Sequence, residues 1–111
     1  MKSMIEGFEP QSLVIVNLVN PKEKFFGSLT ALSQAGVTLR GINLDSYEDW
    51  IREIAHREEV SLDVTTMFFP LFRVERIYLD EGSGAIQSYG QRFHDVTGMS
   101  IPTYLGLDRG H

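Results

Sequence analysis

Two kinds of residue in this sequence could do chemistry: histidines, which can bind metal ions, and a serine between two glycines, which could be a nucleophile. His56, His94 and His111 are spread along the chain, and none stands four residues from a second metal ligand on a predicted helix. Ser83 lies in Glu81-Gly82-Ser83-Gly84-Ala85, which lacks the Gly-x-Ser-x-Gly pattern of an exposed nucleophile. The sequence therefore predicts no metal site and no catalytic serine. We interpret the stretch around Ser83 as a flexible connector.

Cysteine is absent from the chain, which excludes thiolate nucleophiles, disulfides and thiolate metal sites. The paired carboxylates Glu58-Glu59 lie in a polar stretch that offers no apolar pocket for acid–base catalysis. We therefore expect neither an enzyme nor a resident cofactor.

Basic and aromatic residues leave nucleic-acid binding as a remaining chemistry. Basic residues can line one face of the fold, namely Arg40, Arg73 and Arg76 with Lys22 and Lys24, and the four expected to bind are Lys24, Arg40, Arg73 and Arg76. The alternative is an ion-paired strand surface, because Glu75 lies between Arg73 and Arg76. Aromatic rings stack on bases with roughly 1–3 kcal/mol each. The net charge is −5, however, and the segment 45–63 accounts for all of it, because it holds seven acids and two bases. Such an acidic segment would repel a phosphate backbone.

Five apolar, β-branched runs predict strands over residues 12–19, 25–32, 37–44, 64–69 and 74–79. Gly27, inside the second run, marks a sharp bend or a close backbone approach. At Gly41 the apolar positions change face, which predicts a bulge in a strongly bent third strand. Pro70 predicts a tight corner between the last two strands. Lys22, Glu23 and Lys24 are expected at a polar hairpin tip.

Helical spacing of apolar residues predicts a helix over about 47–57, with Ser46 as its N-cap. Similar spacing predicts a second helix within 85–96, which Gly98 ends in a left-handed cap, and Ser100 begins one further short turn. Trp50 is the residue of the first helix that we expect to border a partner groove.

The length of 111 residues, with 42% hydrophobic and 23% charged residues, is that of one globular domain. We expect an α+β domain over 1–111, with a bent five-stranded barrel over 12–79, a helical insertion over 46–57 and a C-terminal helical segment over 85–105. The longest apolar run is far shorter than the ~20 residues that a membrane-spanning helix needs. These features predict a cytoplasmic protein without a membrane partner.

The order of these elements resembles the Sm-like fold, the family of small barrels that includes the bacterial Hfq-type proteins. Phe25-Phe26-Gly27-Ser28-Leu29 is similar to the apolar–x–Gly–x–apolar pattern of that family's second strand, and the short turn near Pro70 is similar to the link between its last strands. The resemblance covers about residues 13–79, and other SH3-like barrels share the glycine pattern. Where the family has an aspartate and an asparagine that bind bases, this sequence has Ser33 and Val37 or Thr38, so those residues do not carry over.

The resemblance implies a homo-oligomer, a ring or a dimer, in which the fourth and fifth strands pair between subunits. The apolar residues expected at that interface are Met67, Phe68, Phe69 and Phe72. It also implies single-stranded RNA as a ligand. The alternative is a protein-interaction or scaffolding module of the same fold that has lost the RNA pocket.

Overall fold

The computed structural model describes residues 6–56 and 63–106, which form an antiparallel sheet and a layer of helices. The five strands are β1 (Leu13–Leu18), β2 (Glu23–Leu32), β3 (Gly36–Asn43), β4 (Thr65–Pro70) and β5 (Val74–Leu79). Their order across the sheet is β4-β3-β2-β1-β5. The predicted α+β class, with five strands and a helix between the third and fourth, is confirmed. The limits of β5 agree residue for residue with the prediction.

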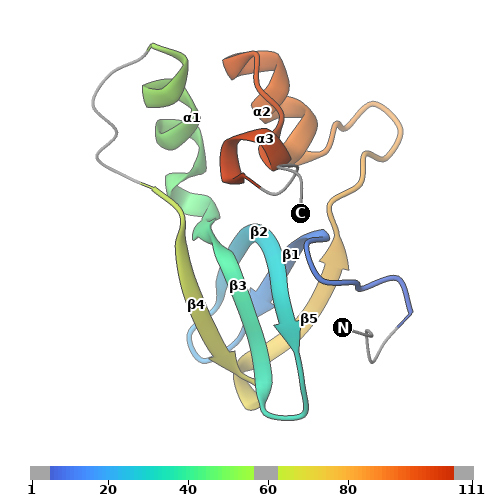
Figure 1. The fold of residues 1–111 in the computed structure, drawn as a ribbon. Helices are drawn as coiled ribbons and strands as arrows, with labels where there is room; N and C mark the ends of the chain where they lie inside the picture. The colour runs from blue at the N-terminus through green and yellow to red at the C-terminus, as the bar shows by residue number, and fades with distance from the viewer. Residues whose placement is uncertain (1–5, 57–62, 107–111) are drawn as a thin grey trace.

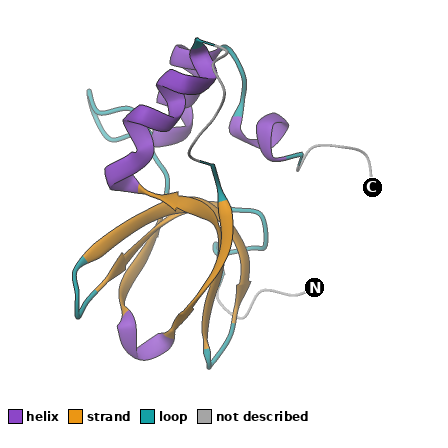
Figure 2. Ribbon diagram, turned by 90° about the vertical axis from the view of Figure 1, so that its left-hand side faces the viewer, coloured by secondary structure: helices purple, strands orange, loops and turns teal. Residues whose placement is uncertain are grey.

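A link of three residues joins the two edge strands of this sheet. Between β4 and β5 lies only the 3₁₀ turn η2 (Leu71–Arg73), although these strands are at opposite edges. The sheet is therefore strongly curved, as Figures 1 and 2 show. Two main-chain hydrogen bonds hold the link: Leu71 N–H donates to Ala35 O at 3.0 Å, and Val19 N–H donates to Arg73 O at 2.8 Å. The predicted corner is present, but it begins at Leu71, because β4 continues through Pro70.

Two glycines allow the centre of the curved sheet to form. Gly27 of β2 lies directly opposite Gly41 of β3. A Cβ atom added to Gly27 would lie 2.3 Å from Arg40 O, and one added to Gly41 would lie 2.1 Å from Phe26 O. The close backbone approach predicted from Gly27 is confirmed, because no other residue type fits this contact.

The bulge predicted at Gly41 is wrong. The register between β2 and β3 shifts instead between Leu29 and Ala31, and Gly41 is paired regularly. The apolar positions change face because the sheet is covered on both sides. Leu39 is buried on one face and Ile42 on the other, so a strand without a bulge there produces the same pattern.

The two faces carry separate apolar cores. The inner core lies within the curve of the sheet and consists of Val14, Val16, Leu18, Leu29, Val37, Leu39 and Phe69. The outer core lies between the convex face and the helices and consists of Ile15, Phe26, Ile42, Tyr47, Trp50, Ile51, Phe93 and Ile101 (Figure 2). Alternate residues of β1 thus contribute to different cores, which explains why nearly every position of this strand is apolar.

Three helices form the layer on the convex face: α1 (Tyr47–Ala55), α2 (Tyr89–Thr97) and α3 (Ile101–Leu105). The predicted left-handed cap at Gly98 is confirmed by its φ of 80°, and the turn predicted at Ser100 is α3. Ser46 is not a side-chain cap, because the 3₁₀ turn η1 (Leu44–Ser46) precedes α1 and Asn43 caps that turn. Residue 57, the predicted end of the first helix, lies outside the described residues.

Several polar contacts attach α2 to the rest of the chain. The carboxylate of Asp80, just after β5, accepts hydrogen bonds from Tyr89 N and Gly90 N, both at 2.8 Å. Arg92 donates two hydrogen bonds of 2.7 Å to Glu48 of α1 and thereby lowers the pKa of that carboxyl. The buried Tyr47 hydroxyl donates to Tyr89 O, and burial raises its pKa. These bonds fix α2 over the end of β5.

The first residues of β2 and α2 differ from the sequence predictions. Glu23 and Lys24 belong to β2, because pairing with β1 continues to Leu18 opposite Glu23, so only Lys22 of the predicted hairpin tip lies in the turn. The helix predicted within 85–96 begins only at Tyr89. The preceding residues form a turn in which Ser83 and Ile86 make a β-bridge.

The Gly27→Val substitution tests the contact at the centre of the sheet. We expect it to lower the free energy of unfolding by about 3 kcal/mol or more, because a branched side chain would collide with the β3 backbone. Urea denaturation followed by circular dichroism measures the change. The control is Thr30→Val, which alters an exposed position of the same strand and should change stability by no more than about 0.5 kcal/mol. Equal midpoints for both variants would contradict this account of β2.

Candidate functional site

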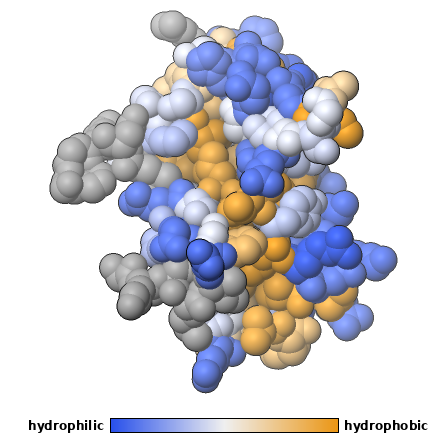
Figure 3. Space-filling view, turned by 90° about the vertical axis from the view of Figure 1, so that its right-hand side faces the viewer, coloured by the Kyte–Doolittle hydropathy of each residue, from blue (hydrophilic) through white to orange (hydrophobic). Residues whose placement is uncertain are grey.

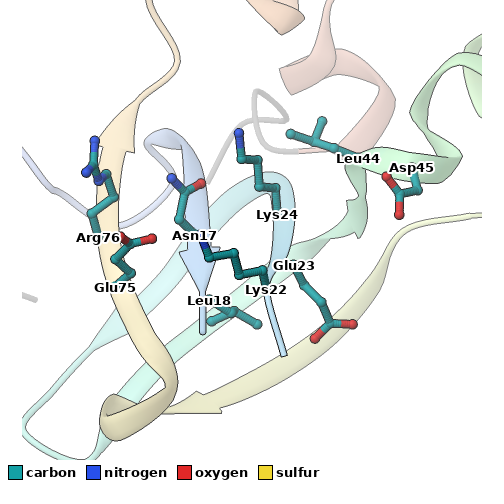
Figure 4. A pocket seen from close by; sticks show the side chains of 9 residues that line it. All are labelled: Asn17, Leu18, Lys22, Glu23, Lys24, Leu44, Asp45, Glu75 and Arg76. Atoms are coloured by element: carbon teal, nitrogen blue, oxygen red, sulfur yellow. The ribbon is translucent and has the colours of Figure 1, made fainter. Parts of the chain in front are cut away.

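The sheet brings two of the four predicted basic residues together. Asn17 of β1 is the cross-strand partner of Lys24 on β2 and of Arg76 on β5, so these three side chains form one row on the same face. Figure 4 shows them side by side and pointing in the same direction. We call Lys24, Asn17 and Arg76 the basic row. Neither Lys24 nor Arg76 makes an ion pair with a described residue.

The basic row borders a hollow of about 410 Å³ on the surface. The other residues that line the hollow are Leu18, Lys22, Glu23, Leu44, Asp45 and Glu75. The amide oxygen of Asn17 is buried and has no hydrogen-bond partner among the described residues, although a buried polar atom without a partner is costly. The two cationic side chains are suited to an anionic ligand such as a phosphate group, whereas the Asn17 oxygen is an acceptor and needs a hydrogen-bond donor.

Acidic side chains limit the positive charge of this hollow. Glu23 is paired with Arg73 at 2.9 Å and contributes little free charge. Glu75 and Asp45 have no cationic partner among the described residues and oppose the three cations that line the hollow. The net balance is a weakly cationic spot on an acidic protein.

Arg73 is held in a structural position. Its Nε atom donates to Val19 O at 2.8 Å, and its Nη2 atom donates to Pro21 O and to the Glu23 carboxylate, both at 2.9 Å. These bonds fasten η2 to the loop between β1 and β2. The sequence prediction grouped Arg73 with the residues that bind RNA, whereas most of its donors are used within the chain.

Arg40 lies apart from the basic row. It is exposed on β3, and its nearest polar partner is the Thr66 hydroxyl at 3.5 Å. The pairing places Arg40 in the row of Leu13 and Ser28, four residues along β1 from Asn17. At about 3.3 Å per residue, this separates the two rows by roughly 13 Å along the strand.

The four apolar residues expected at a subunit interface fall into two groups. Phe68 is 53% exposed and Phe72 is 83% exposed, so both are available to a partner. Phe69 is only 8% exposed and belongs to the inner core, and Met67 packs against that core. Phe69 is thus buried by packing within one chain, because this residue points into the curve of the sheet. Leu71, which was not among the predicted residues, is 47% exposed.

Trp50 does not border a groove. Its side chain is 1% exposed, and its ring lies 5.2 Å from that of Phe93 and 5.6 Å from that of Tyr104. The prediction of a partner groove at this residue is wrong, because α2 and α3 cover it.

The sequence reasoning missed a second hollow, of about 320 Å³, beside β5. Its apolar lining comes from Ile15, Tyr78, Leu79, Ile86 and Tyr89. We call it the β5 hollow. The spacing of Ile86 and Tyr89 matches that of a helix face, so the sequence placed both residues in a helix that packs on the sheet.

Comparison of the chain with models of protein families, with curated proteins and with solved structures finds no match. Within residues 6–56 and 63–106, no helix has the length and apolar character needed to cross a membrane.

The position of Arg73 leads to a prediction about stability. Arg73→Ala should lower the free energy of unfolding by about 2–3 kcal/mol, because it removes three hydrogen bonds, one of them to a carboxylate. Arg76→Ala is the matched control, since Arg76 is exposed and unpaired among the described residues, and it should change stability by no more than about 0.5 kcal/mol. Chemical denaturation compares the two. An Arg73→Ala protein as stable as the control would show that the bonds from η2 contribute little.

Proposed function

We propose that this chain is a non-catalytic interaction module with an Sm-like barrel, which assembles with copies of itself through the edges of its sheet. The observation that carries the proposal is that β4 and β5 are the edge strands of the described sheet, with Phe68 exposed on β4 and Phe72 exposed in the link between them. An unpaired edge presents free main-chain donors and acceptors to another strand. Exposed aromatic rings beside such an edge add apolar area that a partner would bury.

The faces of the two edge strands match one another. Met67 and Phe69 of β4, and Ile77 and Leu79 of β5, all pack against the inner core. If β4 of one copy pairs with β5 of another, the inner cores of the two copies become continuous across the junction. Because β4 and β5 run in the same direction in the sheet, their inner faces match in a parallel pair, whereas an antiparallel pair would set these apolar residues against the outer face.

The chain order of the elements supports the Sm-like part of the proposal. The three-residue link between the fourth and fifth strands, the close approach at Gly27 and the helix that follows the third strand agree with the resemblance seen in the sequence. A contact between two different edges of the same chain generates a ring when the rotation between copies closes.

The mass of the protein in solution tests the assembly. Size-exclusion chromatography with light scattering should give a mass of several chains, and this mass should persist at high salt, because the proposed contact is apolar and main-chain in character. Nuclease treatment beforehand is the control, since an assembly bridged by RNA would dissociate. A monomer under all these conditions would refute the proposal.

A second candidate function is the binding of single-stranded RNA, and the basic row favours it. Lys24 and Arg76 flank Asn17 on adjacent strands, without ion pairs to described residues, beside a hollow of about 410 Å³. Such a row would contact phosphate groups of the backbone, whereas the nearby Glu75 and the acidic α1 would weaken the attraction. RNA would then bind to the assembled module and not drive its assembly.

A charge reversal in the basic row tests RNA binding. Arg76→Glu should weaken the binding of a labelled oligouridylate by roughly tenfold and should reduce the slope of log K against log salt by about 0.7, the value for one phosphate contact on a single strand. Arg52→Glu, an equal change of charge on the exposed side of α1, is the control and should have a much smaller effect. Fluorescence anisotropy measures both. Equal effects of the two variants would show that only net charge matters and would remove the basic row as a site.

A further inference from the structure

Apolar side chains of the β5 hollow are exposed together at the surface. Ile86 is 74% exposed, Tyr78 is 41% exposed and Tyr89 is 37% exposed. Figure 3 looks onto the side of the molecule that carries β5 and shows apolar surface between polar margins. Exposed apolar residues gathered around a hollow are typical of a binding surface, because water in contact with them is displaced favourably.

Two of the three charged side chains that line the β5 hollow, Asp80 and Arg92, have partners, and the third, Glu81, is exposed to solvent. Asp80 accepts hydrogen bonds from two main-chain N–H groups of α2, and Arg92 is paired with Glu48. Gln87 donates to Asp95 at 2.8 Å. An occupant of the hollow therefore needs no charge to satisfy these groups, and an uncharged apolar group suits it best.

The hollow opens on the outer face of the β5 edge. Tyr78 is the cross-strand partner of Ile15, which is a member of the outer core, so Tyr78 lies on the face that carries the helices. β5 pairs with β1 on one side only, and its other side is an edge. A strand added at this edge would place its outward-facing side chains next to Tyr78.

Phe68 lies on the corresponding face of the opposite edge. The pairing runs from Leu13 through Ser28 and Arg40 to Thr66, which puts Thr66 on the face of Leu13. Phe68, two residues further along β4, is on the same face, and its ring is 53% exposed. Its ring lies against Gly36 of β3, where an added Cβ atom would be 2.8 Å from Phe68 Cζ, and its exposed part gives this edge an uncharged apolar surface on the face where the other edge has an apolar hollow.

We propose that Phe68 of one copy inserts into the β5 hollow of the next copy, opposite Tyr78 and between Ile86 and Tyr89. This inference rests on the proposed function, because it requires β4 of one copy to pair with β5 of another. It adds the anchor residue and the register. The strands alternate in direction across the sheet, so β4 and β5 run the same way, and copies whose outer faces are continuous pair these strands in parallel. With Phe68 beside Tyr78, Met67 then lies beside Ile77 and Phe69 beside Leu79, so the inner cores also meet.

The contact is heterologous, since the two surfaces that meet are different parts of the chain. A copy with a damaged β4 surface keeps its β5 hollow, and a copy with a damaged hollow keeps its Phe68. Each kind of damaged copy is then unable to assemble with its own kind but retains one surface that fits the other kind.

Two substitutions at exposed positions test this complementarity. Phe68→Asp and Ile86→Asp should each convert the assembled protein to a monomer, because each places a carboxylate in an apolar contact. Mixing the two proteins should restore one contact and give a heterodimer with one chain of each. Sedimentation velocity and native mass spectrometry measure these species, and circular dichroism confirms that each variant is folded. Met99→Asp, at a 37% exposed residue after α2, is the control and should assemble as the unsubstituted protein does.

The outcomes separate the inference from the proposal on which it rests. If the unsubstituted protein is a monomer, the assembly itself is refuted, and the inference with it. If the unsubstituted protein assembles and the Phe68→Asp protein assembles equally well, the anchor is refuted while assembly stands. If both folded variants are monomers that do not combine, the pairing of Phe68 with the β5 hollow is refuted.

Discussion

The three-residue link η2 is the constraint on which the rest of this structure depends. It joins β4 and β5, which lie at opposite edges of the sheet, and so it requires the sheet to curve through its full width. Hydrogen bonds from Leu71 and Arg73 to loops of other strands hold the link in place. The same curvature requires the backbones of Gly27 and Gly41 to approach one another in the middle of the sheet.

Curvature divides the apolar residues between two sides. The concave side closes over its own side chains and forms the inner core, whereas the convex side needs a cover. The helices supply that cover over Ile15, Phe26 and Ile42, and polar bonds at Asp80 and Arg92 fix their position. The cover is incomplete at β5, where Tyr78 and Ile86 remain exposed, and the opposite edge leaves Phe68 exposed. Both exposed surfaces thus follow from the way the sheet is curved and covered.

Features that depend on neighbours in the sequence were predictable. The strand Val74–Leu79, the helix that begins at Tyr47 and the cap at Gly98 follow from local periodicity and turn chemistry. The role of Arg73 was not predictable, because its three acceptors lie 50 to 54 residues away in the sequence. The regular pairing of Gly41 was not predictable either. The apolar positions of a strand change face when the strand bulges, and they give the same sequence pattern when both faces of the strand are covered. Lys24 and Arg76 were chosen for their charge alone, and only the register shows that they are neighbours.

The burial of Trp50 has a spectroscopic consequence. This residue is the single tryptophan of the chain, and its ring packs against Phe93 of α2 and Tyr104 of α3. The described aromatic residues in and around the inner core are Phe8, Phe25 and Phe69, which absorb little at the wavelengths that excite tryptophan. Intrinsic tryptophan fluorescence of this protein therefore reports on the docking of α2 and α3 over the convex face, while the inner core contributes no tryptophan signal of its own when it unfolds.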